Sequence, residues 1–248
     1  NATSFSRQIA RHCGRPEGDV DSLAHNHPYL RKQRLETFKQ STQRYGMSQS
    51  VLSLGLQMLA RLFDFELCRI YMQPGKPYSF SLTGAYPCVE LEDGAGFHQN
   101  LHKDLSNVDY RWAFERGDEC VVNFDEGAIV GYSFTSSLPT RVIEEVEFFF
   151  PEWCRYIFAD VTTTSYRGLR LAKDRWIVRR DAKRKKYLEP PRGVYYINVA
   201  NSASLKSDKS DGIEAIRLGY CLYIRWRGRI YCWNSRGARR FGIGFRPR

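Results

Sequence analysis

The spacing of apolar residues predicts an alternation of helices and strands along most of the chain. Leucines recur at helical intervals in residues 48–63, whereas residues 66–72 and 154–162 are compact apolar runs of the kind that forms strands. Further helices are predicted at 30–42, 97–114, 171–187 and 201–211, further strands at 88–91, 142–150 and 193–200, and hairpins at 119–124/128–134 and 219–226/229–233.

Strands that alternate with helices predict a sheet covered on both faces, and adjacent hairpins predict that the sheet is mixed. We therefore expect an α/β fold, a three-layer α-β-α sandwich around a mixed central sheet. The chain has 248 residues, 42% of them hydrophobic and 14% aromatic, which suffices for one large folded domain. We place this domain at 46–248, after a basic, partly ordered arm at 1–45. We expect no membrane-spanning helix and no secretory signal segment.

The seven cysteines show no C-x-x-C pair, and several fall inside apolar strand-like runs. Free cysteine in such a run behaves as a small core residue, so we expect unpaired thiols and a reducing cytoplasm. His25 and His27, like His98 and His102, are close in sequence, but no cysteine or carboxylate cluster completes a zinc site. We expect no bound metal.

The net charge of +11 is concentrated toward the C-terminus. Glu214 is the last acidic residue, and nine arginines follow it. Such a distribution attracts polyanions, namely nucleic acid, an acidic protein or a phosphorylated cofactor. The alternative is a loose, solvated tail. For a second basic run, at 179–186, a solvated helix face is the favoured interpretation.

The segment 160–172 reads as the end of a strand, a turn at Arg167-Gly168 and the start of a helix. A helix N-terminus has unpaired backbone N–H groups and a partial positive charge, so this turn suits a phosphate or pyrophosphate. The alternative is an ordinary strand-to-helix turn with an exposed arginine.

The order of elements and this turn resemble the GCN5-related N-acetyltransferase (GNAT) superfamily. Its signature, Arg/Gln-x-x-Gly-x-Gly/Ala after the fourth strand, aligns with Arg167, Gly168, Leu169, Arg170, Leu171 and Ala172. The resemblance extends over residues 110–233 and only loosely over 48–110. It implies a splayed central sheet and an acyl-coenzyme A whose pyrophosphate is held by backbone N–H groups of this turn.

A second match is Asn201-Ser-Ala-Ser204, which follows the predicted strand at 193–200. In the family this asparagine contacts the pantetheine arm of the cofactor or the main chain beside it, which assigns Asn201 and Ser204 to the cofactor site. The alternative for Asn201 is a helix cap, and the two roles are compatible.

Two positions depart from the family pattern. Arg170 replaces the usual glycine, where its side chain either crowds the pyrophosphate or adds a phosphate contact. Asp208 stands where many members place a tyrosine that protonates the leaving thiolate, so the familiar acid is absent unless Tyr220 or Tyr223 replaces it.

The chemistry implied is direct attack of an amine on a thioester. The resemblance assigns the polarisation of the carbonyl to backbone N–H groups in the region of Val161, Thr162 and Thr163. Asp160 and Glu147 are candidate general bases, because a half-buried carboxylate near the acceptor cleft can take up the amine proton. The alternative is that Glu147 and its acidic neighbours mark a solvent-facing strand edge.

Three functions remain open. The first is a bacterial N-acyltransferase that moves an acetyl or other acyl group from acyl-coenzyme A to the amine of a small molecule or peptide. The second is an enzyme similar to the synthases of N-acyl amino acids or acyl-homoserine lactones, which take the acyl group from acidic acyl carrier protein. The third, ranked last, is a non-enzymatic protein that binds nucleic acid through its basic charge.

Overall fold

The computed structural model describes residues 42, 46–48, 51–52, 54–56, 64–73, 82–105, 108–186, 191–201, 204–205 and 215–248. The predicted arm at 1–45 and the predicted helix at 30–42 lie outside these ranges except for residue 42. Within the predicted helix at 48–63 the described residues are helical, as are residues 204 and 205 within the prediction at 201–211.

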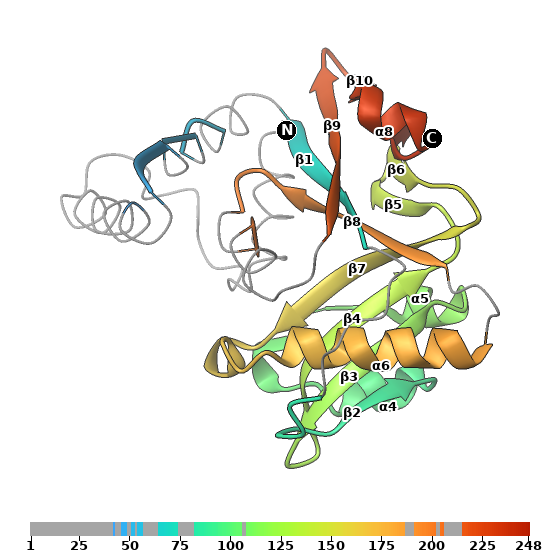
Figure 1. The fold of residues 1–248 in the computed structure, drawn as a ribbon. Helices are drawn as coiled ribbons and strands as arrows, with labels where there is room; N and C mark the ends of the chain where they lie inside the picture. The colour runs from blue at the N-terminus through green and yellow to red at the C-terminus, as the bar shows by residue number, and fades with distance from the viewer. Residues whose placement is uncertain are drawn as a thin grey trace.

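An eight-stranded sheet organises the structure, in the order β10-β9-β1-β8-β7-β4-β3-β2 (Figure 1). Neighbouring strands in it are antiparallel except β7 and β8, which are parallel, so the mixed sheet is confirmed. Its strands are β1 (Asp64–Met72), β2 (Cys88–Leu91), β3 (Glu119–Asp125), β4 (Ala128–Ser136), β7 (Cys154–Thr162), β8 (Arg192–Asn198), β9 (Ile216–Trp226) and β10 (Arg229–Asn234).

Helices cover both faces of the β2–β3–β4 half of the sheet, which confirms the α/β class and its three layers. In Figure 1, α6 (Leu171–Lys186) crosses the front, and α4 (Gly94–Gln99) and α5 (Arg111–Glu115) lie behind. Phe97 of α4 and Ala113 of α5 are fully buried against Tyr132 and Phe134 of β4.

The single helix predicted at 97–114 is wrong. Asp93 starts α4 early, because its carboxylate accepts hydrogen bonds from the N–H groups of Ala95 and Gly96 at 2.8 and 2.9 Å. Leu101 then forms a bridge to Ile129 of β4, which ends the helix and leaves the short 3₁₀ turn η1 (Lys103–Leu105) before α5. The apolar residues whose spacing suggested one long helix instead belong to α4, η1, α5 and the segments between them, which pack on the same core.

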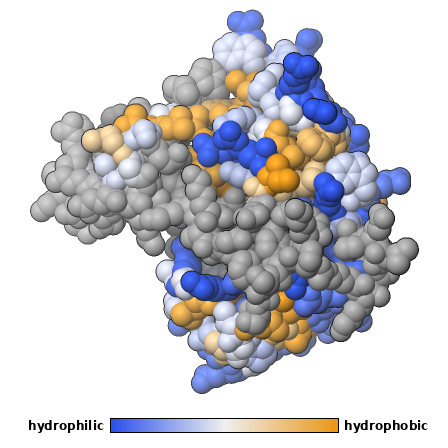
Figure 2. All heavy atoms as spheres, in the orientation of Figure 1, coloured by the Kyte–Doolittle hydropathy of each residue, from blue (hydrophilic) through white to orange (hydrophobic). Residues whose placement is uncertain are grey.

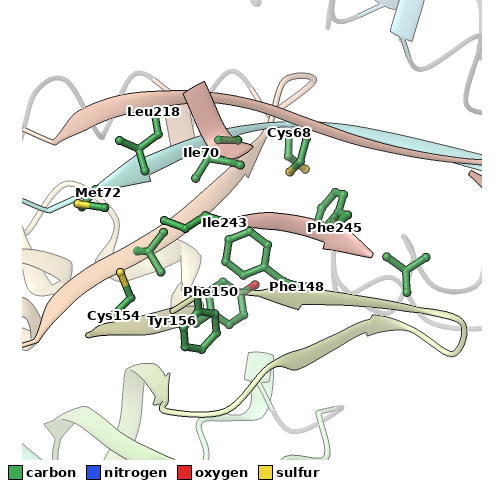
Figure 3. Packing of buried hydrophobic residues seen from close by; sticks show 14 of the residues in the cluster. Cys68, Ile70, Met72, Phe148, Phe150, Cys154, Tyr156, Leu218, Ile243 and Phe245 are labelled. Carbon is green, nitrogen blue, oxygen red and sulfur yellow. The ribbon is translucent and has the colours of Figure 1, made fainter. Parts of the chain in front are cut away.

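A second, three-stranded sheet covers the β8–β1–β9 half of the molecule. It consists of β5 (Thr140–Ile143), β6 (Val146–Phe149) and β11 (Gly244–Pro247), in the order β11-β6-β5, with α8 (Arg236–Arg240) beside it. Phe148 and Phe245 of this sheet are buried against Ile70 of β1 and Tyr156 of β7 (Figure 3). In this half, the layer that packs on the large sheet is therefore a second sheet and not a helix.

In this region the structure corrects one prediction and excludes one alternative. The strand predicted at 142–150 is a hairpin, because the chain turns at Glu144-Glu145 and Arg225 of β9 pairs with the Glu145 carboxylate at 2.7 and 2.8 Å. The basic C-terminal segment is not a loose tail, because Ile243 and Phe245 are buried in the core shared by the two sheets.

Both predicted hairpins of the large sheet are confirmed, and their turns explain them. Glu126 and Gly127 have φ of 47° and 83°, and Arg227 and Gly228 have φ of 49° and 74°. Two consecutive residues with positive φ are typical of the type I′ turn, whose twist matches that of the strands it joins.

Free thiols fill part of the core, as the cysteine pattern predicted. Cys68, Cys120, Cys154 and Cys221 are almost completely buried. Burial raises the pKa of Cys120 and Cys154 to about 12, so both remain protonated packing residues at neutral pH. No helix in the described ranges combines the length and the apolar character that crossing a membrane requires.

Helix α6 buries cations against the sheet, so the interpretation of 179–186 as a solvated face is wrong for Arg179 and Lys183. Their exposures are 4% and 6%. The hydroxyl groups of Ser133 and Thr135, on β4, are buried without a hydrogen-bond partner among the described residues, as are Nε and Nη2 of Arg179. Burial lowers the pKa of Lys183 to about 7, although Glu119 lies 3.7 Å away.

Replacing Lys183 with methionine should stabilise the protein most at and below pH 7. The pKa of this lysine is lower in the folded than in the unfolded chain, so its charged form costs free energy that is relieved as the pH rises from 7 toward 10. We expect the difference in free energy of unfolding between variant and wild type, on the order of 4 kcal/mol at pH 7, to shrink by about 1.4 kcal/mol per pH unit between pH 7 and pH 10. Urea denaturation at pH 6 to 10 measures it.

The control is Lys103→Met, at an exposed lysine of η1. This variant should differ from wild type by the same small amount at every pH. A difference for Lys183→Met that does not change with pH would contradict the buried cation.

Candidate functional site

Strands β7 and β8 pair over only three residues and then diverge. Only Cys154, Arg155 and Tyr156 of β7 pair with β8, at Arg192, Gly193 and Val194. Beyond these pairs the strands diverge in Figure 1, although β7 continues to Thr162 and β8 to Asn198. Because parallel strands run in the same direction, the opening lies at the C-terminal ends of both, the position where α/β sheets bind ligands.

A β-bulge lies on the open stretch of β7. The pairing with β4 jumps from Phe134↔Phe158 to Tyr132↔Val161, so Ala159 and Asp160 share a single position opposite β4. Ala159 has φ of 50°, an uncommon conformation for a residue with a side chain. A bulge re-aims backbone groups out of the ladder, here beside the opening.

Arg175 of α6 fixes this bulge from below. Its Nη2 donates to Asp160 Oδ1 at 2.5 Å and to Thr162 Oγ1 at 3.0 Å, and its Nη1 donates to Asn123 Oδ1 of β3 at 2.6 Å. The side chain is 1% exposed, and it reaches the sheet over Gly131, where a Cβ would overlap Nη1. One guanidinium thus ties α6 to β3, to the bulge residue Asp160 and to Thr162 just after the bulge.

The turn after β7 carries unpaired donors to the same edge. Gly168 and Arg170 have φ of 89° and 61°, and the first backbone bond of α6 is from Lys173 N to the carbonyl of Arg170. The N–H groups of Leu171 and Ala172 therefore precede the helical ladder and have no backbone acceptor among the described residues.

Tyr166 anchors the turn at its other end. Its hydroxyl group donates to the carboxylate of Asp125 in the β3–β4 hairpin. This hydrogen bond raises the pKa of Tyr166 to about 12. The 3₁₀ turn η2 (Thr164–Tyr166) is thus held to a neighbouring strand pair while Gly168 and Arg170 remain exposed.

The predicted cofactor residues fall into two groups at this edge. Arg167, Gly168, Leu169 and Arg170 are exposed on the turn, and the Leu171 side chain is buried in the α6–sheet interface. Asn201 follows β8, so it lies at the same end of the parallel pair. Its Oδ1 accepts from Ser204 N at 3.1 Å, the helix-cap geometry that the sequence left as the alternative.

The predicted backbone donors at 161–163 are not equivalent. Thr163 N donates to the carbonyl of Val130 in β4 at 3.0 Å, so this amide is already used. Val161 pairs with Tyr132, and Thr162 pairs with Gly131. The stretch not paired with β4 is Ala159-Asp160, immediately before the predicted region.

The structure separates the three predicted catalytic residues. Asp160 belongs to the bulge and is bound by Arg175. Glu147 lies on β6, where its carboxylate pairs with Arg246 at 2.6 Å. Tyr220, on β9, lies opposite Arg69 of β1 and therefore on the face of the sheet away from Tyr196.

A row of stacked aromatic rings borders the opening on the face that carries the second sheet. Trp112 of α5 stacks on Phe158 at 5.7 Å, Phe158 on Tyr156 at 5.5 Å, and Tyr156 on Tyr196 of β8 at 5.7 Å. The row therefore crosses from β7 to β8 where the strands diverge. Trp112 is 41% exposed, which leaves one end of the row open to a ligand.

Glu66 of β1 is the carboxylate that sequence reasoning missed. Its Oε1 accepts from Asn198 Nδ2 at 3.1 Å, and Asn198 is the last residue of β8. Burial is the main cause that raises the pKa of Tyr156 and of Tyr196, and the charge of Glu66 is a smaller contribution to both. A partly buried carboxylate thus lies beside the diverging strands. No local pattern marks it, because β1 reaches this place only through long-range pairing.

A separate open hollow of about 600 Å³ lies on α4 and α5, lined by Ala95, His98, Asp109, Arg111 and Phe114 among others. Its lining contains no residue of β7 or β8. Within the described ranges, no three His, Cys, Asp or Glu side chains are grouped as metal ligands would be.

No protein-family model matches the chain, and no curated protein matches it. A solved structure from Novosphingobium aromaticivorans, named “Putative Acetyltransferase from the GNAT family”, is 13% identical with a TM-score of 0.40, over 64% of this chain and 62% of its own. A functionally unknown conserved protein from Staphylococcus epidermidis is 10% identical with a TM-score of 0.43, over 68% and 65%.

This chain thus spans less than two thirds of the length of either structure. The first structure carries the name of the superfamily that the sequence motifs resemble. With TM-scores below 0.5, neither likeness assigns an activity, a substrate or a site residue to this chain.

Replacing Gly131 with alanine should destabilise the protein by about 1–3 kcal/mol. The new Cβ would overlap Nη1 of Arg175 and lie 3.2 Å from the carbonyl oxygen of Val161, and the guanidinium is held by three acceptors and cannot yield freely. Chemical denaturation measures the change. Gly55→Ala is the control, because Gly55 is helical and has no atom within 4 Å of an added Cβ, so its stability should be unchanged or higher.

Proposed function

We propose that the protein is an N-acyltransferase that transfers an acyl group from acyl-coenzyme A to an amine. One observation carries the proposal: β7 and β8 diverge beside a bulge, at the edge where the start of α6 presents the unpaired N–H groups of Leu171 and Ala172. This edge offers a phosphate site and, beside it, backbone donors suited to a carbonyl. The buried free thiols suit a reducing compartment, and we propose the cytoplasm.

The turn would hold the pyrophosphate. The N–H groups of Leu171 and Ala172 lie in the first turn of the 16-residue helix α6, where the helix dipole favours an anion. Gly168 has no side chain that would keep a phosphate away from the backbone. The space beside it is open, since nothing lies within 4 Å of a Cβ built on it. Arg170 is exposed with φ of 61°, and its charge would add to the attraction of an anion.

The bulge would polarise the thioester carbonyl. Donors that are already oriented stabilise the developing oxyanion without reorganisation, and each is worth about 3 kcal/mol in comparable sites. Ala159 and Asp160 supply the candidate N–H groups, and Arg175 holds them rigid by binding Asp160 and Thr162. Arg175 is therefore a positioning residue in this proposal.

Glu66 would accept the proton of the attacking amine. The amine nitrogen bonds to the carbonyl carbon, the carbon–sulfur bond breaks, the amine proton passes to the Glu66 carboxylate, and the thiolate leaves with a proton from solvent. Asn198 orients the carboxylate through its hydrogen bond. The carboxylate of Asp160 pairs with Arg175 and that of Glu147 with Arg246, so both have structural roles in this proposal.

Coenzyme A should raise the melting temperature of the wild-type protein, because a ligand that binds only the folded state stabilises it. Gly168→Val should abolish this shift, because a β-branched residue is strained at φ of 89° and displaces the turn. Differential scanning fluorimetry with 1 mM coenzyme A, acetyl-coenzyme A and desulfo-coenzyme A measures the effect.

Gly117→Val is the matched control, since Gly117 is also exposed, has φ of 80° and has open space around it, but lies between α5 and β3. It should lose stability like Gly168→Val and keep the full ligand shift. The pyrophosphate site would be contradicted if coenzyme A caused no melting-temperature shift in the wild-type protein. It would also be contradicted if both variants lost the shift equally. A melting-temperature shift seen only with acyl carrier protein thioesters would indicate that the acyl donor is the carrier protein and not coenzyme A.

Glu66→Gln should lower kcat by about 10²–10⁴-fold with little change in the melting-temperature shift caused by coenzyme A. An amide cannot accept the amine proton, whereas it preserves the size of the side chain. Thiol release from acetyl-coenzyme A, with the best acceptor from a panel of amino acids, polyamines and peptides, measures turnover. Glu147→Gln should stay within twofold of wild type, and a larger loss there than at Glu66 would reverse the assignment.

A further inference from the structure

The edge strand β10 carries an outward row of three large side chains. Arg229, Tyr231 and Trp233 alternate along β10, and each lies opposite a residue of β9, with Arg229 opposite Trp226. Because paired residues of antiparallel strands point to the same side, Trp226 belongs to the same surface. We name these four residues the β10 face.

The β10 face does not contribute to the core. Tyr231 is 50% exposed, Trp233 53% and Trp226 46%. The alternate residues Ile230 and Cys232 point the other way and pack against the core shared by the two sheets. Three large aromatic side chains that folding does not bury are therefore gathered on one strand pair, which marks an interaction surface.

The C-terminal segment that carries the β10 face is basic, although its Arg225 and Arg246 pair with carboxylates of other elements. Residues 215–248 contain nine arginines and no aspartate or glutamate. The Arg227 guanidinium lies 5.8 Å from the centre of the Trp226 ring, so cations and rings are interleaved. Blue and pale side chains gather at the top of Figure 2, at the end where Figure 1 places β9 and β10.

We propose that the β10 face binds single-stranded nucleic acid. Aromatic rings stack on unpaired bases whatever their sequence, and arginines neutralise the phosphates between them. Tyr231 and Trp233 are two positions apart on a strand, about 7 Å, so each has room for a base of its own. A duplex keeps its bases stacked and offers no such contact.

This site is independent of the proposed acyl transfer. In the sheet order, β9 and β1 separate β10 from β8, so the β10 face contributes nothing to the opening between β7 and β8. Variants of the β10 face should therefore leave the coenzyme A shift unchanged, and Gly168→Val should leave nucleic-acid binding unchanged.

Fluorescence polarisation of the full chain with fluorescein-labelled dT12 and U12, at 50 to 300 mM salt, tests the proposal. Trp233→Ala and Tyr231→Ala should each weaken binding by about tenfold without changing the salt dependence, because they remove a ring and no charge. Arg229→Ala should reduce the slope of log affinity against log salt by about one. Trp153→Ala is the matched control, since Trp153 is 47% exposed outside the β10 face, and it should bind like wild type.

Several results would overturn the proposal. One is no binding of dT12 or U12 at 50 mM salt, and another is equal loss in Trp153→Ala and Trp233→Ala. A 12-bp duplex or polyglutamate of equal charge that competes as well as dT12 would show attraction of any polyanion in place of base stacking. A dimer in light scattering that Trp233→Ala dissociates would assign the β10 face to a second copy of the chain.

Discussion

The Arg175 guanidinium is the interaction on which the candidate site depends. A buried charge is costly unless nearly all its donors are satisfied, and Arg175 meets this condition with acceptors from two strands. Of these acceptors, Asp160 belongs to the bulge, Thr162 follows it on β7, and Asn123 lies on β3. The guanidinium that holds α6 on the sheet therefore also fixes the backbone conformation of β7 beside the opening between β7 and β8. The position of the helix and the geometry of the site depend on the same contacts.

Elements defined by local signals were predictable from the sequence. Glu126-Gly127 and Arg227-Gly228 announce their hairpins, because few residue pairs tolerate two consecutive positive φ values. The strand β7 and the helix α6 follow from apolar runs bounded by turn residues, and so does the turn at Gly168 between them. These are the elements that carry the proposed pyrophosphate site.

Features that depend on distant residues were not predictable. The apolar spacing after Phe97 fits one helix, until Leu101 is used by a strand that comes later in the chain. The pattern of 179–186 fits a solvated helix face, but α6 packs on the sheet and buries Arg179 and Lys183. Glu66 has no distinguishing neighbours in sequence, since only tertiary pairing of β1 brings it to Asn198.

The place of β1 between β8 and β9 has a consequence for how the chain acquires its structure. The contact between Glu66 and Asn198 spans 132 positions and that between Asp64 and Arg225 spans 161. On a ribosome, this early strand is made long before either neighbour exists, and it waits with both hydrogen-bonding edges uncovered. Loop closure over such separations slows folding. The edges of β1 remain available to aggregation and to chaperones until the C-terminal hairpin has been synthesised and has paired with it.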